Sequence, residues 1–215
     1  MSETTEVPID DRKLDELTER LLQGSGRRLV AMVGAPSSGK SEIAEALEAR
    51  INAETPGRVA VVPMDGFHLD DEVLDALGLR ERKGAPETFD VGGLRATLER
   101  LRAADEPWVA VPVFSRDDEL SRAAARLVRR ETEVVIVEGN YLLLDEDPWT
   151  GLPRFDLSVR LDVPEEELER RLRRRWESYD LPEDEIRRRI EENDLPNGRR
   201  VIERSREPDL VLRAE

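Results

Sequence analysis

The residues whose types and spacing best suit chemistry form one uninterrupted stretch: Gly34, Ala35, Pro36, Ser37, Ser38, Gly39, Lys40 and Ser41. They complete the pattern G-x-x-x-x-G-K-[ST], in which backbone N–H groups surround a phosphate. Gly34 and Gly39 are expected to adopt positive φ and to let the backbone approach the phosphate closely. Lys40 is expected to contact the β- and γ-phosphates, and the Ser41 hydroxyl to ligate Mg²⁺. The stretch therefore predicts binding of a nucleoside triphosphate.

The residues on either side supply the structure that this pattern requires. Residues 29–33 form a short apolar run, which is typical of a buried parallel strand. After the stretch, Ile43, Leu47 and Ile51 recur at helical spacing. The alternative is a glycine-rich turn that matches by accident, but the order strand, loop, helix favours phosphate binding.

Acidic residues follow two further apolar runs. Residues 58–63 predict a strand that leads into Asp65, and residues 134–137 predict a central strand that ends at Glu138. Open α/β sheets bind ligands at the carboxyl ends of their strands, so both acids are expected near the phosphates. Asp65 and Glu138 are therefore candidates to hold Mg²⁺ together with Ser41. The alternatives are a turn or cap role for Asp65 and an ordinary strand-end position for Glu138.

The densest positive charge lies on a helix predicted after Pro164. Its apolar ridge is Leu168, Leu172 and Trp176, and its other positions carry Arg170, Arg171, Arg173, Arg174 and Arg175. Glu–Arg pairs four residues apart would make this a solvated face. Because five arginines exceed the three available pairs, we expect a surplus that closes over a transferring phosphoryl group. Residues 164–195 are accordingly expected to form a lid.

The remaining elements follow from the same periodicities. Helices are expected at residues 10–23 (within an N-terminal segment 1–25), about 117–130 and 182–193, and strands at 108–114, 156–163 and 209–213. Residues 193–197 are expected to interrupt the last helix before a short third one. Residues 64–116 are expected to be an insertion that covers the substrate. Alternating strands and helices predict one α/β domain over residues 1–215, with about five parallel strands and helices on both faces.

Composition narrows the class of partner. The chain has 215 residues, a formal net charge of −15 and no cysteine. The negative charge disfavours nucleic acid and anionic membranes, and the lack of cysteine excludes disulfides and thiolate catalysis. No run of 18 apolar residues is present, and the acidic, polar N-terminus disfavours a signal peptide. We expect a cytoplasmic protein with a small-molecule partner. A homodimer is compatible with the sequence, which does not define the oligomeric state.

Five segments together resemble one known family: GAPSSGKS, MDGFH, RKGAPETFD, VVIVEGNYLLL and ERRLRRRW. From about residue 28 onward, the chain resembles P-loop kinases of the uridine kinase, phosphoribulokinase and pantothenate kinase group. It is most similar to their bacterial fructose-transport-associated, nucleoside/nucleotide kinase-like branch. The resemblance implies a P-loop NTPase fold, a three-layer αβα sandwich with an Arg-rich lid. It also implies ATP- and Mg²⁺-dependent phosphorylation of a hydroxyl group.

The resemblance also implies roles for individual residues. Asp65 matches the acid that deprotonates the acceptor hydroxyl, and Glu138 matches the acid near the metal. Arg171 and either Arg174 or Arg175 match the lid arginines. The candidate substrate residues are His68, Arg82, Lys83, Asp90, Phe114, Arg116 and Tyr141.

Several alternatives stay open at this stage. Asp90 is also a good helix N-cap, and Arg82 and Lys83 also fit a solvated charge run. Position 115 is serine where relatives often have aspartate, which puts an acceptor contact there in doubt. The acceptor could be a sugar such as fructose, a nucleoside or pantothenate. A P-loop switch ATPase that acts on a protein partner is the rival class.

Overall fold

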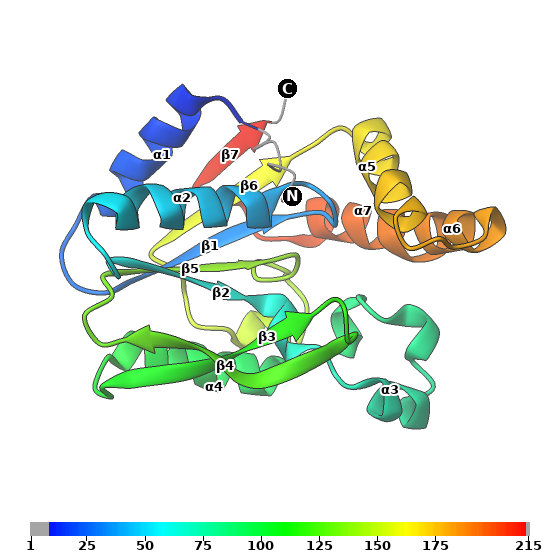
Figure 1. Ribbon diagram of the computed structural model, residues 1–215, viewed down its shortest axis with the longest axis horizontal. Coiled ribbons are helices and arrows are strands. Elements are labelled where there is room, and N and C mark those ends of the chain that lie inside the picture. The colour runs from blue at the N-terminus through cyan, green and yellow to red at the C-terminus, as the bar shows by residue number, and fades with distance from the viewer. Residues whose placement is uncertain (1–8, 214–215) are drawn as a thin grey trace.

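A five-stranded parallel sheet forms the centre of the computed structural model, which describes residues 9–213 (Figure 1). Its strand order is β2-β5-β1-β6-β7. The bounds are β1 Arg28–Gly34, β2 Val59–Pro63, β5 Val134–Gly139, β6 Leu157–Asp162 and β7 Leu210–Arg213. The predicted parallel sheet of about five strands is confirmed. Residues 1–8 of the predicted N-terminal segment and residues 214–215 lie outside the described part.

Both faces of this sheet are covered, which explains why its strands are apolar at nearly every position. Val30 and Met32 of β1 belong to a buried cluster with helices α1 (Asp11–Leu22) and α2 (Lys40–Glu54). Leu29 and Ala31 alternate to the opposite face and belong to a cluster with α4 (Val91–Ala103). The expected helices on both faces are therefore present.

The prediction of a helix at residues 117–130 is wrong. The chain forms an antiparallel hairpin there, β3 (Trp108–Ser115) and β4 (Leu120–Arg129), which makes a separate two-stranded sheet. The Ala- and Arg-rich sequence of β4 favours a helix by propensity alone. Pairing with β3 and burial of Val128 override that preference, and Arg126 donates a 2.6 Å hydrogen bond to the Val61 carbonyl.

The predicted interruption at residues 193–197 is also absent. Helix α6 (Glu183–Arg189) continues through a π-helical turn, Ile190–Asp194, into α7 (Leu195–Arg204). The Leu195 N–H bonds to the Ile190 carbonyl, five residues earlier. Pro196 has no N–H to donate, and it lies directly after this π-helical turn, where the spacing of the backbone hydrogen bonds changes. The π turn accommodates the proline within the helical segment. One continuous helical segment therefore replaces the two predicted ones.

Short helices occupy much of the segment between β2 and β3. They are a 3₁₀ turn at Met64–Phe67, α3 at Asp71–Leu77, and 3₁₀ turns at Arg80–Arg82 and Pro86–Thr88. A further 3₁₀ turn covers Trp149–Gly151. Helix α5 (Glu165–Glu177) and α6 extend to one side of the sheet in Figure 1. They share a small apolar cluster with Ala35 at the start of the phosphate-binding stretch.

Gly66 lets the hairpin pass directly over the end of β2. A Cβ atom at this position would overlap the Pro112 carbonyl oxygen and lie 2.7 Å from its carbon. We expect Gly66→Ala to lower the free energy of unfolding by about 1–3 kcal/mol, the usual cost of overpacking. Gly92→Ala is the matched control, because its Cβ would meet nothing closer than 3.6 Å. It should leave stability equal or raise it by about 0.5–1 kcal/mol. Urea denaturation that ranks the two variants equally would contradict this packing.

Candidate functional site

The phosphate-binding loop connects the end of β1 to the start of α2. Gly39 adopts a φ of 95°, as predicted, but the other residue with positive φ is Ser37 at 60°. The prediction of positive φ at Gly34 is wrong. Glycine is needed there for space, because a Cβ would lie 2.5 Å from the Ser38 hydroxyl and 3.2 Å from the Leu161 carbonyl oxygen.

The N-terminus of α2 is prepared to bind an anion. Its N-cap residue is Gly39, and no side chain caps the first turn. The first N–H groups of a helix lack intrahelical partners, and the helix dipole places partial positive charge at this end. Lys40, the first helical residue, adds a full positive charge. This combination is suited to phosphate groups.

Parallel strand pairing brings the two predicted acids to this loop. Glu138 of β5 pairs with Met32 of β1 on one side and Pro63 of β2 on the other. Asp65 lies in the 3₁₀ turn directly after β2. The loop, Asp65 and Glu138 therefore meet at one edge of the sheet, as predicted.

Glu138 and Ser41 fit a magnesium site. The Ser41 hydroxyl donates a 3.1 Å hydrogen bond to Oε2 of Glu138. Glu138 is only 6% exposed. Burial raises the pKa of Glu138 to about 7, Lys40 opposes this rise, and the Asp65 charge adds to it. No group of three or more His, Cys, Asp or Glu residues suited to a metal occurs within residues 9–213. Oxygen donors completed by phosphates and water are the set that Mg²⁺ usually takes.

Asp65 stays ionised despite its partial burial. Burial acts to raise its pKa, but His68, Lys40, Arg116 and Arg175 together hold the pKa below the usual range. Among these four residues, Arg116 forms an ion pair with Asp65, with 3.9 Å between Arg116 Nη2 and Asp65 Oδ2. An ionised carboxylate next to the phosphate loop can accept a proton or approach a metal.

A cavity of about 590 Å³ opens beside Asp65. The predicted residues that line it are Pro36, Asp65, His68, Arg82, Lys83, Phe114, Arg116 and Arg175. Arg175 comes from α5, and its Nε is buried without a hydrogen-bond partner. A buried guanidinium nitrogen without a partner indicates a ligand, and an anion suits it best.

The other two predicted lid arginines lie elsewhere. Arg171 donates a 3.0 Å hydrogen bond to the Ser38 carbonyl and so ties α5 to the phosphate loop. Arg174 is exposed and pairs with no acid among the described residues. The predicted braces four residues apart are only partly present: Arg170 and Arg171 both bind Glu167, and Arg173 binds Glu183 of α6. Arg174 and Arg175 are therefore the surplus.

Two predicted substrate residues do not line the cavity. Asp90 is exposed, and its Oδ1 accepts a 2.8 Å hydrogen bond from the Gly93 N–H, so it caps α4. Tyr141 is fully buried, and its hydroxyl donates a 2.7 Å hydrogen bond to the Gly84 carbonyl. Asp90 therefore has the helix-cap role that the sequence offered as the alternative to substrate binding.

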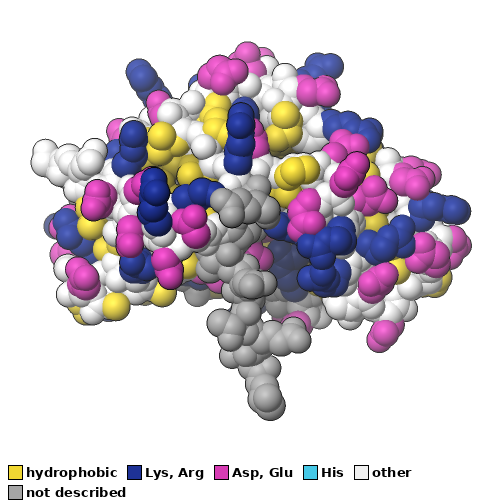
Figure 2. All heavy atoms as spheres, turned by 90° about the horizontal axis from the view of Figure 1, so that it is seen from above, with side chains coloured by type: hydrophobic (Ala, Val, Ile, Leu, Met, Phe, Trp, Pro, Cys, Tyr) yellow, Lys and Arg dark blue, Asp and Glu magenta, His cyan; other side chains and the backbone are white. Residues whose placement is uncertain are grey.

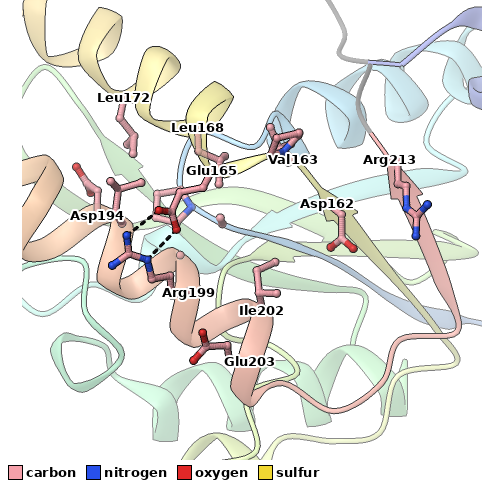
Figure 3. Close-up of a pocket in the computed structure, with 15 residues that line it drawn as sticks. Asp162, Val163, Glu165, Leu168, Leu172, Asp194, Arg199, Ile202, Glu203 and Arg213 are labelled. Carbon is pink, nitrogen blue, oxygen red and sulfur yellow. Dashed lines mark hydrogen bonds and ion pairs between the residues drawn. The ribbon is translucent and has the colours of Figure 1, made fainter.

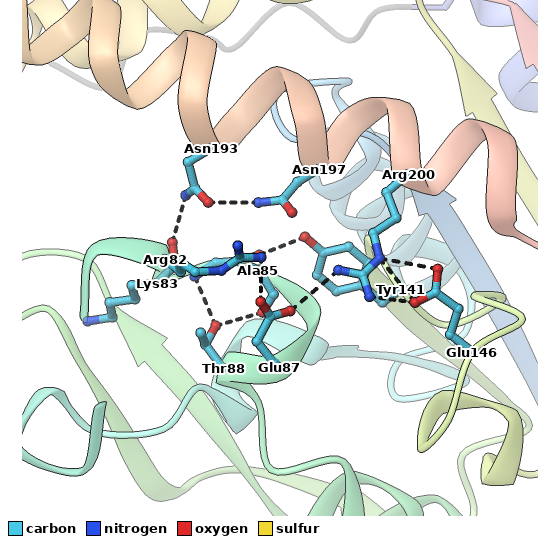
Figure 4. Close-up of polar contacts among 11 residues, drawn as sticks. Arg82, Lys83, Ala85, Glu87, Thr88, Tyr141, Glu146, Asn193, Asn197 and Arg200 are labelled. Carbon is cyan, nitrogen blue, oxygen red and sulfur yellow. Dashed lines mark hydrogen bonds and ion pairs between the residues drawn. The ribbon is translucent and has the colours of Figure 1, made fainter. Parts of the chain in front are cut away.

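Hydrogen bonds hold the loop of residues 82–88 against its neighbours (Figure 4). Asn193 of the π-helical turn donates to the Lys83 carbonyl at 3.0 Å, and the Gly84 N–H donates to the Thr88 hydroxyl. The Lys83 ammonium lies 2.7 Å from Asp71 and 3.2 Å from Glu119, and Arg82 pairs with Glu87. These two cations are thus paired within the protein, not free in solvent.

Sequence reasoning missed Asn140. It lines the cavity, it is 9% exposed, and its Oδ1 is buried without a partner. Its signal was its position, because it follows Glu138 by two residues at the same strand end. Arg189 and Asp194 also line the cavity; they lie within the lid expected at residues 164–195 but were not among the predicted site residues.

A second cavity, of about 480 Å³, lies between α5, α7 and the ends of β6 and β7 (Figure 3). Its walls are largely apolar, with Leu168, Leu172 and Ile202 among them. Arg199 at its border is held by Glu165 through two hydrogen bonds of 2.6 and 2.7 Å. It shares Ala35 and Pro36 with the phosphate loop but contains neither Asp65 nor Glu138.

The surface carries charges of both signs. On the face in Figure 2, acidic and basic side chains alternate, and basic ones gather beside a hollow toward the α5–α6 side. This arrangement concentrates positive charge locally in a chain whose net charge is −15. None of the helices between residues 9 and 213 is both long and apolar enough to span a bilayer.

Comparison with known proteins supports this geometry. No protein-family model matches the chain. A crystal structure from Silicibacter sp. TM1040, described as a "putative fructose transport system kinase", is 41% identical, with a TM-score of 0.83 over 94% of this chain and 97% of that one. The "Uncharacterized protein YggC" of Escherichia coli K12 is 35% identical over 86% of this chain and 77% of its own.

Named kinases match as well. The Schizosaccharomyces pombe protein "Putative uridine kinase C227.14" is 30% identical over 94% of this chain and 91% of its own. Pantothenate kinases also match, but the chain spans only about half of their length. The chain therefore belongs to the P-loop kinases of the uridine kinase and pantothenate kinase group, whose members act on small molecules.

Proposed function

We propose that this protein transfers the γ-phosphate of ATP to a hydroxyl group of a small metabolite, a sugar or a nucleoside. The observation that carries the proposal is the position of Asp65. It lines one cavity together with Pro36 of the phosphate loop and Arg175 of α5, and Lys40 is close enough to lower its pKa. Phosphate-binding groups and a proton acceptor thus surround the same space.

Each group of residues in the site has a separate role in the proposed phosphoryl transfer. The α2 N-terminus and Lys40 bind the phosphates, and Arg175 neutralises charge on the transferring group. Ser41, Glu138 and Asp65 would hold Mg²⁺, which neutralises charge on the phosphate oxygens when bound. The acceptor O–H gives its proton to Asp65 as its oxygen bonds to the γ-phosphorus, the bond to the β-bridging oxygen breaks, and ADP leaves.

The first test concerns nucleotide binding. Lys40→Ala removes a charge-assisted hydrogen bond, so we expect the Kd for ATP to rise about 10- to 100-fold, measured by isothermal titration calorimetry. Arg12→Ala is the control, because the Arg12 side chain on α1 is 85% exposed and its one ion pair within residues 9–213 is with Glu16. It should leave the Kd unchanged. A folded Lys40→Ala protein with wild-type affinity would refute the nucleotide site.

The second test concerns the proton acceptor. Asp65→Asn keeps the shape of the side chain but removes its charge, so acceptor phosphorylation should fall about 10²-fold or more. ATP affinity should change much less, because the loop and Lys40 make most phosphate contacts. The assay is repeated at several Mg²⁺ concentrations to separate a loss that arises through the metal.

Asp90→Asn is the matched control for Asp65→Asn, since asparagine also caps a helix. It should retain turnover. An equal loss in both variants would restore a substrate role to Asp90. Near-normal turnover in Asp65→Asn would place the base elsewhere, and His68 would be the next candidate.

The third test concerns the lid. If α5 and α6 close over the phosphates, amide hydrogen exchange over residues 165–195 should slow when Mg²⁺, a non-hydrolysable ATP analogue and acceptor are added. Helix α1 provides the internal reference and should not change. Unaltered exchange in the lid would favour a permanently solvated Arg-rich face.

A further inference from the structure

Asn140 presents a hydrogen-bond acceptor that the protein does not satisfy. The residue lines the cavity beside Asp65, and its Oδ1 is buried without a donor. Its amide also interacts with the Tyr141 side chain, which anchors the other end of the group. A buried acceptor without a donor is destabilising. Such an atom at a cavity wall indicates a ligand that donates to it.

His68 offers a second hydrogen-bonding atom. Its Nδ1 lies 2.8 Å from the Asp65 carbonyl oxygen and donates to it, because a carbonyl oxygen can only accept, and this leaves Nε2 to bind a ligand. Ring centroids of Phe89 and Phe114 lie 4.1 and 5.0 Å away and hold the imidazole in place. No residue within 9–213 donates a hydrogen bond to Nε2, and His68 lines the cavity.

The cations of the cavity indicate where negative charge belongs. Five of them already have acidic partners: Arg80 with Asp71, Arg82 with Glu87, Lys83 with Asp71 and Glu119, Arg188 with Glu81, and Arg189 with Glu185. Within the described part of the chain, Arg116 and Arg175 form no comparably short ion pair, and the charges of both lower the pKa of Asp65. The positive charge that protein acids neutralise least therefore lies at the phosphoryl end, and the end that binds the alcohol offers the Asn140 amide oxygen instead.

The aromatic rings leave little room for a stacked base. Phe89 is 7% exposed and packs on His68 and on the edges of Tyr141 and Trp149. Phe114 packs on His68 and under the Lys83 ammonium, which lies 5.1 Å from its ring centroid. Trp176, the remaining aromatic ring of the cavity, has the guanidinium groups of Arg175 and Arg189 5.1 and 4.7 Å from its centroid. All three rings are thus in contact with protein groups.

From these contacts we infer that the acceptor is an uncharged polyol or sugar, with separate hydroxyls that donate to Asp65 and to Asn140 Oδ1 and a further hydroxyl that forms a hydrogen bond with His68 Nε2. The hydroxyl at Asp65 receives the phosphate, and the other two fix the orientation of the molecule. The inference rests on the phosphotransferase function proposed above. It makes Asn140 a specificity-determining residue.

The test measures transfer from ATP to D-fructose, D-ribose, glycerol, uridine and pantothenate. We expect a sugar or glycerol to have the highest kcat/KM. Asn140→Leu should raise the KM for that compound about 10- to 100-fold and leave the KM for ATP within twofold. Analogues of that compound that each lack one hydroxyl should raise the KM of the wild-type protein by a similar factor. For the analogue that lacks the hydroxyl bound by Asn140, the effects of the missing hydroxyl and of Asn140→Leu on KM should not add. Thr132→Val, which removes a buried hydroxyl bond to Gly57 before β5, should lower Tm without changing either KM.

Each result decides the inference. If uridine or pantothenate has the highest kcat/KM, the inference is wrong but the phosphotransferase function stands. The same holds if the effects of Asn140→Leu and of every missing hydroxyl on KM are fully additive. Transfer to water alone would refute the proposed function, and saturation-transfer NMR of the same five compounds would then decide the inference. Sugar or polyol binding weakened by Asn140→Leu would support it, and no such binding to wild type would overturn it. His68→Phe, which keeps the ring packing, provides an independent variant if Asn140→Leu does not fold.

Discussion

The site depends on the parallel pairing of β5 between β1 and β2. This pairing aligns three strand ends, so that the phosphate loop, Asp65 and Glu138 meet at one edge of the sheet. Apolar side chains on both faces fix the register, because a slip of one residue would turn each strand's side chains to the opposite face. The hydrophobic core thereby sets the positions of charged groups that would otherwise repel one another.

That arrangement leaves charges that the protein alone does not fully compensate. Glu138 is buried with a raised pKa, and the Arg175 Nε has no partner. A metal ion and phosphate groups would compensate both at once, so stability is lower than it could be in the absence of ligand. The neighbouring Arg82 and Lys83 differ from Arg175, because Glu87 and Asp71 of the protein already neutralise them.

The sequence predicted the five-stranded sheet and the phosphate loop because both rest on local patterns: continuous apolar runs and a motif with fixed spacing. The sequence-based prediction failed at β4, where pairing with β3 outweighs helix propensity. It also failed at Pro196, which follows a π-helical turn within one continuous helical segment. It also assigned Asp90 and Tyr141 to the substrate, although their side chains cap a helix and support a loop. Asn140 was missed because a buried amide oxygen without a partner is visible only in three dimensions.

The central claim is that phosphate passes to an alcohol rather than to water. It is tested most directly by ³¹P NMR of the purified protein with ATP, Mg²⁺ and each alcohol in turn, because the method resolves phosphate esters from inorganic phosphate. The account predicts that one alcohol yields one phosphate ester for each ADP formed, with little inorganic phosphate. ATP turnover that yields inorganic phosphate alone, at a rate independent of every alcohol, would contradict it and favour a switch ATPase.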